Sequence, residues 1–159
     1  MHIESSRGQR LGNPGAVIAW PRPQDASSDL DLSRTEAATA STAEMLYTGP
    51  LYSGWCGLYR ARSGNGIVVR FNSRKLPYLG LWLCYGGWPE DPLQPRQYAV
   101  AFEPTVAPWG TLTRALEKDQ APVLAAYASF RFTIAIERIG PLPMTYDEFA
   151  AQCLGPAAG

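Results

Sequence analysis

Residues 78–85, with the sequence YLGLWLCY, contain no charged side chain and are bounded by Pro77 on one side and by Gly86 and Gly87 on the other. Eight residues are short for a buried helix but typical of a strand. Successive side chains of a strand point to opposite faces, so apolar residues at every position mean that both faces are covered. The segment therefore predicts the central strand of a two-layer sandwich.

Glycine and proline punctuate the whole chain, occurring 15 and 14 times in 159 residues, and 11% of the residues are aromatic. This composition favours many short strands joined by turns over a helical bundle. We therefore expect an all-β fold, mainly antiparallel, in which the last predicted strand alternates in polarity and has one buried face. The other predicted strands are Ala16–Trp20, Met45–Thr48, Trp55–Ala61, Gly66–Phe71, Tyr98–Glu103 and Phe130–Glu137.

Local signals add a hairpin and two short helices. Residues 62–66, RSGNG, predict a tight turn between two strands. Helices are expected over Thr111–Lys118 and Thr145–Cys153, and the second begins with a capping-box pattern of Thr145 and Glu148. We expect residues 1–44 to be an irregular segment with a long loop, in which residues 29–32 could pair as an edge, and residues 45–159 to form one domain.

Composition also bounds the function. Fourteen basic and fourteen acidic side chains give a formal net charge of zero, and the arginines are scattered along the sequence. Neither property favours binding to nucleic acid or to a membrane surface. The three cysteines are widely spaced, without a CxxC pair or a Cys/His cluster, so we expect reduced, buried thiols in a cytoplasmic protein and neither a metal site nor a cofactor.

An aromatic cluster accompanies the predicted central strand. Trp82 and Tyr85 lie within the strand, and Trp88 follows the two glycines that turn the backbone. Aromatic faces with polar tips suit the apolar face of a sugar ring, which makes these three residues candidates for substrate binding. The alternative is that the rings serve only core and loop packing, as most buried aromatic residues do.

One carboxylate ends an apolar stretch. Glu103 follows residues 98–102, YAVAF, and precedes Pro104, which removes a backbone donor and is expected to end the strand. A glutamate is rarely placed in such a run unless it is paired or used. We therefore consider two roles for Glu103: a catalytic carboxylate at the rim of a sheet, or a structural ion pair with an arginine such as Arg70 or Arg96.

The order and spacing of these motifs resemble the aldose 1-epimerase family, the galactose-mutarotase-like proteins with a β-supersandwich fold. The resemblance extends from about Met45 to Glu137 and corresponds to the C-terminal part of the family's domain. It is carried by YxGxW at 78–82, GGWP at 86–89, AFEP at 101–104 and YTGPLxxGWC at 47–56.

This resemblance implies an isomerase of carbohydrate metabolism that interconverts the anomers of a free aldose. In the family a glutamate takes the proton of the anomeric hydroxyl, and a histidine gives a proton to the ring oxygen. The glutamate's motif matches residues 101–103, so the resemblance assigns the base to Glu103. A base near neutral pH needs a raised pKa, which a partly dry aromatic pocket provides.

The chain also departs from the family pattern. The family's histidines lie in an N-terminal half that has no counterpart here, and the single histidine, His2, is expected to be a disordered terminal residue. Glu44 is the best match for a sugar-binding aspartate. A completing N-terminal half or a second copy of the chain would then cover the exposed strand edges. A non-catalytic carbohydrate-binding module and a purely structural remnant are the alternatives.

Overall fold

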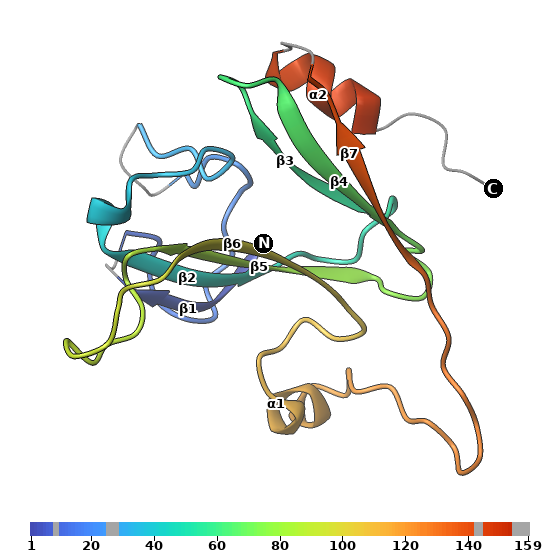
Figure 1. Ribbon diagram of the computed structural model, residues 1–159. Coiled ribbons are helices and arrows are strands. Elements are labelled where there is room, and N and C mark those ends of the chain that lie inside the picture. The colour runs from blue at the N-terminus through green and yellow to red at the C-terminus, as the bar shows by residue number, and fades with distance from the viewer. Residues whose placement is uncertain (8–9, 25–28, 142–144, 154–159) are drawn as a thin grey trace. The chain divides into compact units, whose positions relative to one another are not determined.

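The computed structural model describes residues 1–7, 10–24, 29–141 and 145–153. The chain divides into two compact units, each with its own antiparallel sheet (Figure 1). The first unit comprises Met1–Leu51 and Tyr78–Val123, and the second comprises Tyr52–Pro77 and Leu124–Gly159. The mainly antiparallel, all-β fold class is confirmed, with two short helices among the described residues. No helix in these ranges is long and apolar enough to cross a membrane.

The first unit is built on a four-stranded sheet. Its strands run in the order β1-β2-β5-β6, and every neighbouring pair is antiparallel. The strands are β1 (His2–Arg7), β2 (Thr42–Tyr47), β5 (Tyr78–Tyr85) and β6 (Tyr98–Thr105). As predicted, β5 is a central strand, with a neighbour on each side.

The core of the first unit lies on one face of β5. Leu79, Leu81, Leu83 and Tyr85 alternate along the strand and are all almost completely buried. Each such apolar side chain contributes roughly 1.5–3 kcal/mol when it is removed from water. We call this the Tyr85 face of the sheet, and burial here explains why the segment carries no charge.

The second unit contains a three-stranded sheet in the order β3-β4-β7 and a helix, α2. The predicted hairpin is confirmed, because Arg60 pairs with Asn65 across the turn between β3 and β4. Phe149 of α2 packs with Val68 and Cys153 in a small core. The bounds are β3 (Trp55–Arg60), β4 (Asn65–Phe71), β7 (Ile134–Ile139) and α2 (Tyr146–Cys153).

Both predicted helices form, and each begins at a side-chain cap. Thr111 accepts a hydrogen bond from the backbone N–H of Arg114 at the start of α1 (Leu112–Glu117). At α2, the Thr145 hydroxyl accepts from the N–H of Glu148, and the Glu148 carboxylate accepts from the N–H of Thr145 at 2.6 Å. This reciprocal pair is the capping box that the sequence predicts.

The N-terminal segment differs from the prediction. Residues 2–7 form strand β1 rather than an irregular chain, so His2 is an ordered strand residue and not a disordered terminus. Residues 16–20, predicted as a strand, contribute only a bridge from Val17 to His2. Residues 29–32, considered as an edge, form turns and coil. A short, mainly polar strand gives no periodic signal, and here β2 supplies the hydrogen-bond partners.

Several strand boundaries were also predicted wrongly, among them the start of β2, which lies at Thr42 rather than Met45. β6 does not end at Glu103 but continues through Pro104 to Thr105, because β6 is an edge strand on which proline costs no ladder bond. β7 begins at Ile134 rather than Phe130, since its partner β4 ends at Phe71, opposite Ile134. The buried face expected for β7 is absent, because Ile134 and Ile136 are both exposed.

Candidate functional site

Four residues form one straight row across the sheet of the first unit. His2 pairs with Tyr47, Tyr47 pairs with Gly80, and Gly80 pairs with Glu103. Directly paired residues of antiparallel strands project to the same face. The row therefore places the only histidine of the chain and the predicted catalytic glutamate on one side of the sheet, which we call the His2 face.

The imidazole of His2 contacts two aromatic rings. Its centroid lies 5.5 Å from that of Tyr47, in a stacked arrangement, and 4.9 Å from that of Trp109. The resulting burial lowers the pKa of His2 below 6.5, and Arg114 lowers it further, while Glu4 and a hydrogen bond with the backbone of Pro108 oppose the shift. The imidazole is thus neutral over most of the physiological pH range.

Glu4 is the charged neighbour of His2. One of its carboxylate oxygens, Oε2, lies 4.0 Å from His2 Nε2, and the other, Oε1, lies 3.5 Å from a guanidinium nitrogen of Arg114. Arg114 in turn covers the ring of Trp109, at 4.9 Å from its centroid. His2 Nε2 and Glu4 Oε2 are buried without a hydrogen-bond partner among the described residues. Both atoms are shielded from solvent, so a ligand or a water molecule can reach them only when a neighbouring side chain moves.

Tyr47 lies between the histidine and the glutamate. The absence of a side chain at Gly80 lets the Tyr47 ring and the Met45 methyl group come close to its backbone. A Cβ at Gly80 would approach Tyr47 Cε1 at 2.9 Å and Glu103 Cβ at 3.2 Å, so these two side chains flank the same glycine. Burial, with a smaller effect from Glu103, raises the pKa of Tyr47 to about 12. The phenol keeps its proton and acts as a hydrogen-bond donor at neutral pH.

Glu103 itself is exposed, so the partly dry pocket expected around it is not formed by the described residues, and it makes no hydrogen bond or ion pair with them. The alternative role for Glu103 was an ion pair with an arginine such as Arg70 or Arg96, but both arginines bond other groups. Arg70 pairs with Glu137, and Arg96 donates to the backbone carbonyl of Pro89. The carboxylate is therefore available to accept a proton or to bind a hydroxyl group.

The three predicted aromatic residues do not form one wall. Trp82 is on the His2 face, two residues along β5 from Gly80, and its ring meets that of Trp88 edge to face with centroids 6.4 Å apart. Trp88 is exposed enough to contact a ligand, at 44%. Tyr85, by contrast, is 2% exposed and lies on the opposite face. Trp82 and Trp88 accompany Glu103, whereas Tyr85 belongs to the core.

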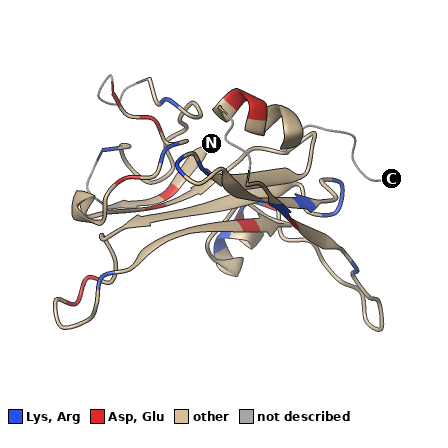
Figure 2. Ribbon diagram, turned by 45° about the horizontal axis from the view of Figure 1, so that its top comes forward, with Lys and Arg blue, Asp and Glu red and all other residues tan. Residues whose placement is uncertain are grey.

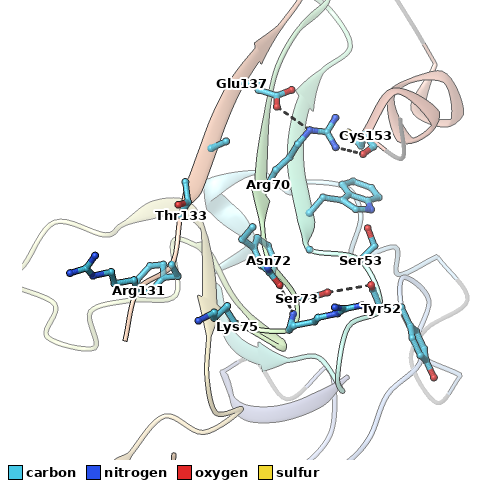
Figure 3. A pocket seen from close by; sticks show the side chains of 16 residues that line it. Tyr52, Ser53, Arg70, Asn72, Ser73, Lys75, Arg131, Thr133, Glu137 and Cys153 are labelled. Carbon is cyan, nitrogen blue, oxygen red and sulfur yellow. Dashed lines mark hydrogen bonds and ion pairs between the residues drawn. The ribbon is translucent and has the colours of Figure 1, made fainter. Parts of the chain in front are cut away.

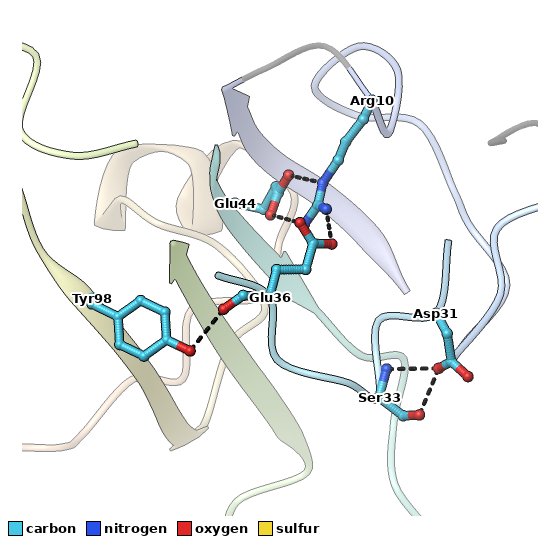
Figure 4. Close-up of polar contacts among 6 residues, drawn as sticks. All are labelled: Arg10, Asp31, Ser33, Glu36, Glu44 and Tyr98. Atoms are coloured by element: carbon cyan, nitrogen blue, oxygen red, sulfur yellow. Dashed lines mark hydrogen bonds and ion pairs between the residues drawn. The ribbon is translucent and has the colours of Figure 1, made fainter. Parts of the chain in front are cut away.

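The Tyr85 face contains a buried ion network instead (Figure 4). Glu44 is completely buried, and both of its oxygens accept from Arg10, at 2.6 and 2.9 Å. Arg10 also pairs with Glu36, whose backbone carbonyl accepts from the Tyr98 hydroxyl at 2.7 Å. Glu44, proposed above as a sugar-binding carboxylate, is thus engaged in an internal ion pair on the face opposite Glu103.

Sequence reasoning missed the residues around the histidine. Glu4, Trp109 and Arg114 were not singled out, and the isolated Ile3 between two polar residues was too weak a signal for a strand. Within the described ranges, no group of three or more His, Cys, Asp or Glu side chains is arranged to hold a metal ion. The side chains on the His2 face can transfer protons and bind hydroxyl groups.

Comparison with known proteins adds no family assignment. The chain has no match among the family models, the curated proteins or the solved structures with which it was compared. The resemblance to aldose 1-epimerases is carried only by the motifs described above, and function has to be argued from the site.

Proposed function

We propose that the His2 face binds a free aldose and interconverts its anomers, as aldose 1-epimerases do. The observation that carries this proposal is the row His2, Tyr47, Gly80 and Glu103, which places a candidate acid and a candidate base on one face. Three strand spacings separate the Cα atoms of His2 and Glu103 by roughly 14 Å. The two side chains and a pyranose between them can bridge that separation.

Glu103 serves as the base in this reaction. Its carboxylate takes the proton of the anomeric hydroxyl, the carbonyl forms at the anomeric carbon, and the bond to the ring oxygen breaks. The exposed carboxylate without an ionic partner among the described residues supports this role, since its lone pairs are free to accept. Closure of the ring on the other face of the carbonyl gives the second anomer, and the proton returns from Glu103.

His2 is the proposed proton donor to the ring oxygen. Its lowered pKa makes the imidazolium a stronger acid, although a smaller fraction is protonated at neutral pH. Glu4 lies beside Nε2 and offsets part of that loss by favouring the protonated form. Tyr47 is protonated at neutral pH and can donate a hydrogen bond to the ring oxygen as negative charge develops on it.

The experiment is polarimetry with freshly dissolved α-D-glucose and α-D-galactose. The wild-type chain is expected to accelerate mutarotation, and Glu103→Gln is expected to lower the rate constant about 10²–10⁴-fold, the range for a lost general base. Asp147→Asn is the matched control, because Asp147 is an exposed carboxylate on α2, in the second unit. Its rate should equal that of the wild type.

Two results would contradict the proposal. One is a wild-type rate no faster than that of buffer, and the other is equal activity in Glu103→Gln and in the wild type. His2→Gln separates the roles further, since loss of the proton donor should abolish the alkaline limb of the pH–rate profile while sugar binding remains.

A second function, sugar binding without catalysis, is favoured by the Trp82–Trp88 pair and by the exposure of Glu103. Edge-to-face tryptophans with one exposed ring provide a platform for the apolar face of a sugar. In this case tryptophan fluorescence responds to millimolar sugar, Trp88→Ala removes the response, and mutarotation stays at the buffer rate. Trp20→Ala is the control, because Trp20 is comparably exposed, at 42%, and forms no ring contact with Trp82 or Trp88 among the described residues.

A further inference from the structure

A cavity of about 670 Å³ lies within the second unit (Figure 3). Three segments and the last residue of α2 surround it. The segments are residues 52–55 before and at the start of β3, residues 70–75 at the end of β4, and residues 131–137 leading into β7. A volume of this size accommodates a small organic ligand. Every lining residue belongs to the second unit, so the cavity is separate from the row on the four-stranded sheet.

Basic side chains that are scattered in sequence line this cavity. Arg70, Arg74, Lys75 and Arg131 all line it, against a single carboxylate, Glu137. The second unit as a whole contains seven Lys and Arg residues and three Asp and Glu residues, whereas the first contains seven and eleven. Figure 2 shows the charged residues on the ribbon. The chain has no formal net charge, but its second unit is basic and its first unit is acidic.

Arg70 is already engaged within the protein. Its Nε donates to Glu137 at 3.0 Å, and its Nη1 donates to the carbonyl of Cys153 at 2.6 Å. These bonds hold the end of α2 against β4 and neutralise the only carboxylate of the cavity. Arg70 is thus a positioning residue, and its charge and that of Glu137 cancel.

The three other cations are left without acidic partners among the described residues. Arg74 and Arg131 form no ion pair there, and Lys75 only approaches the ring of Phe130, at 5.5 Å from its centroid. All three side chains are exposed. Three positive charges around one cavity favour a dianion over a monoanion or a neutral ligand.

The remaining lining residues supply hydrogen bonds and flat apolar surfaces. Asn72 accepts from the backbone N–H of Arg74 through Oδ1 at 2.9 Å, which leaves its amide hydrogens as donors. Tyr52 is fully exposed, and Phe132 is 53% exposed. Exposed rings beside a cluster of cations suit a ligand that combines a ring with an anionic group.

We propose that this cavity binds a small, ring-bearing phosphate monoester, with the phosphate among Arg74, Lys75 and Arg131 and the ring against Phe132. Three available cations match the charge of one phosphate. A single-stranded nucleic acid would need a longer basic track, because its affinity grows with the number of phosphates neutralised. The ring is a nucleobase or a sugar, and the experiment distinguishes the two.

The experiment is isothermal titration calorimetry on the full chain with AMP, adenosine, glucose 6-phosphate, glucose and inorganic phosphate. AMP or glucose 6-phosphate is expected to bind at least tenfold more tightly than its counterpart without phosphate and than inorganic phosphate. Whichever of the two binds more tightly identifies the ring. Equal binding of a phosphorylated ligand and its uncharged counterpart, or no binding at all, would overturn the proposal.

Variants locate the ligand. The double substitution Arg74→Gln and Arg131→Gln is expected to weaken binding at least tenfold, whereas Arg131→Lys, which keeps the charge, retains most of it. Arg62→Gln is the control, since Arg62 is an exposed arginine in the β3–β4 turn and does not line the cavity. An unchanged affinity in the double variant would refute the site, and thermal melting verifies that each variant is folded.

A final arm tests the competing macromolecule. A twelve-nucleotide single-stranded oligothymidylate should bind no more tightly than AMP at physiological salt. If it binds more tightly, with an affinity that falls steeply as salt rises, the cavity is part of a nucleic-acid surface and the small-molecule proposal is wrong.

Discussion

His2 and Glu103 lie on the two outer strands of one four-stranded sheet and in the same cross-strand row. One hundred residues of sequence separate them, and neither residue predicts the other. Strand register alone brings His2 and Glu103 to one face of the sheet. Tyr47 and Gly80 occupy the two positions between them in the row. A slip of one residue in any of the three strand pairings would place them on opposite faces.

The buried ion pair of Arg10 and Glu44 is predicted to be essential for stability. Glu44→Gln leaves the partly buried guanidinium with Glu36 as its remaining carboxylate partner, which should lower the free energy of unfolding by about 1–3 kcal/mol. Urea denaturation measures the loss. The exposed Glu117→Gln should stay within about 0.5 kcal/mol of the wild type, and a Glu44→Gln value equally small would mean that the pair does not hold the fold together.

Stability is predicted to depend on pH through His2. Burial lowers the pKa of His2 in the folded state below its ordinary value of 6.5, so the unfolded chain takes up the proton first. The contribution is fully present above pH 6.5 and is lost as pH falls through the folded pKa. Urea midpoints measured from about pH 8 to about pH 5 should fall less in His2→Gln than in the wild type. Parallel curves would exclude His2 as the titrating group.

Two glycines with positive φ angles should respond differently to alanine. Gly86 has a φ of 81° and Gly12 a φ of 94°, so alanine is strained at both, by about 1–2 kcal/mol. At Gly86 a Cβ would also collide with the carbonyl oxygen of Ala38, whereas at Gly12 nothing lies within 4 Å. Thermal and urea unfolding should therefore show a clearly larger loss for Gly86→Ala. Equal losses would mean that the collision is relieved by a backbone shift.

The three cysteines are predicted to be unreactive in the native protein. Cys56, Cys84 and Cys153 are all free and buried, as the sequence led us to expect. Burial, together with the neighbouring Cys153, raises the pKa of Cys56 to about 12. Because the thiolate is the reactive form, Ellman's reagent should label no thiol rapidly at pH 8 but all three in guanidinium chloride. Rapid labelling of the native chain would show that at least one thiol is accessible.

Much of the fold could be predicted because its signals are local. The uncharged segment 78–85 is β5, the turn at 62–66 joins a hairpin, and Thr145 with Glu148 caps α2. Each of these depends on side-chain polarity or turn chemistry within a few residues. β1 escaped prediction because six mainly polar residues become a strand only when β2 provides their hydrogen bonds.

The candidate sites divide in the same way. By itself, the sequence marked Glu103, Trp82 and Trp88 as unusual, because a carboxylate and large rings are conspicuous in short apolar segments. Only the tertiary structure decided that Tyr85 lies on the other face, that Glu44 is paired with Arg10, that His2 is aligned with Glu103, and that Arg131 joins Arg74 and Lys75 around one cavity. The polarity of each side chain follows directly from the sequence. The sheet face on which a side chain lies, its ion-pair partner and the grouping of charges depend on strand register and on which distant segments come into contact.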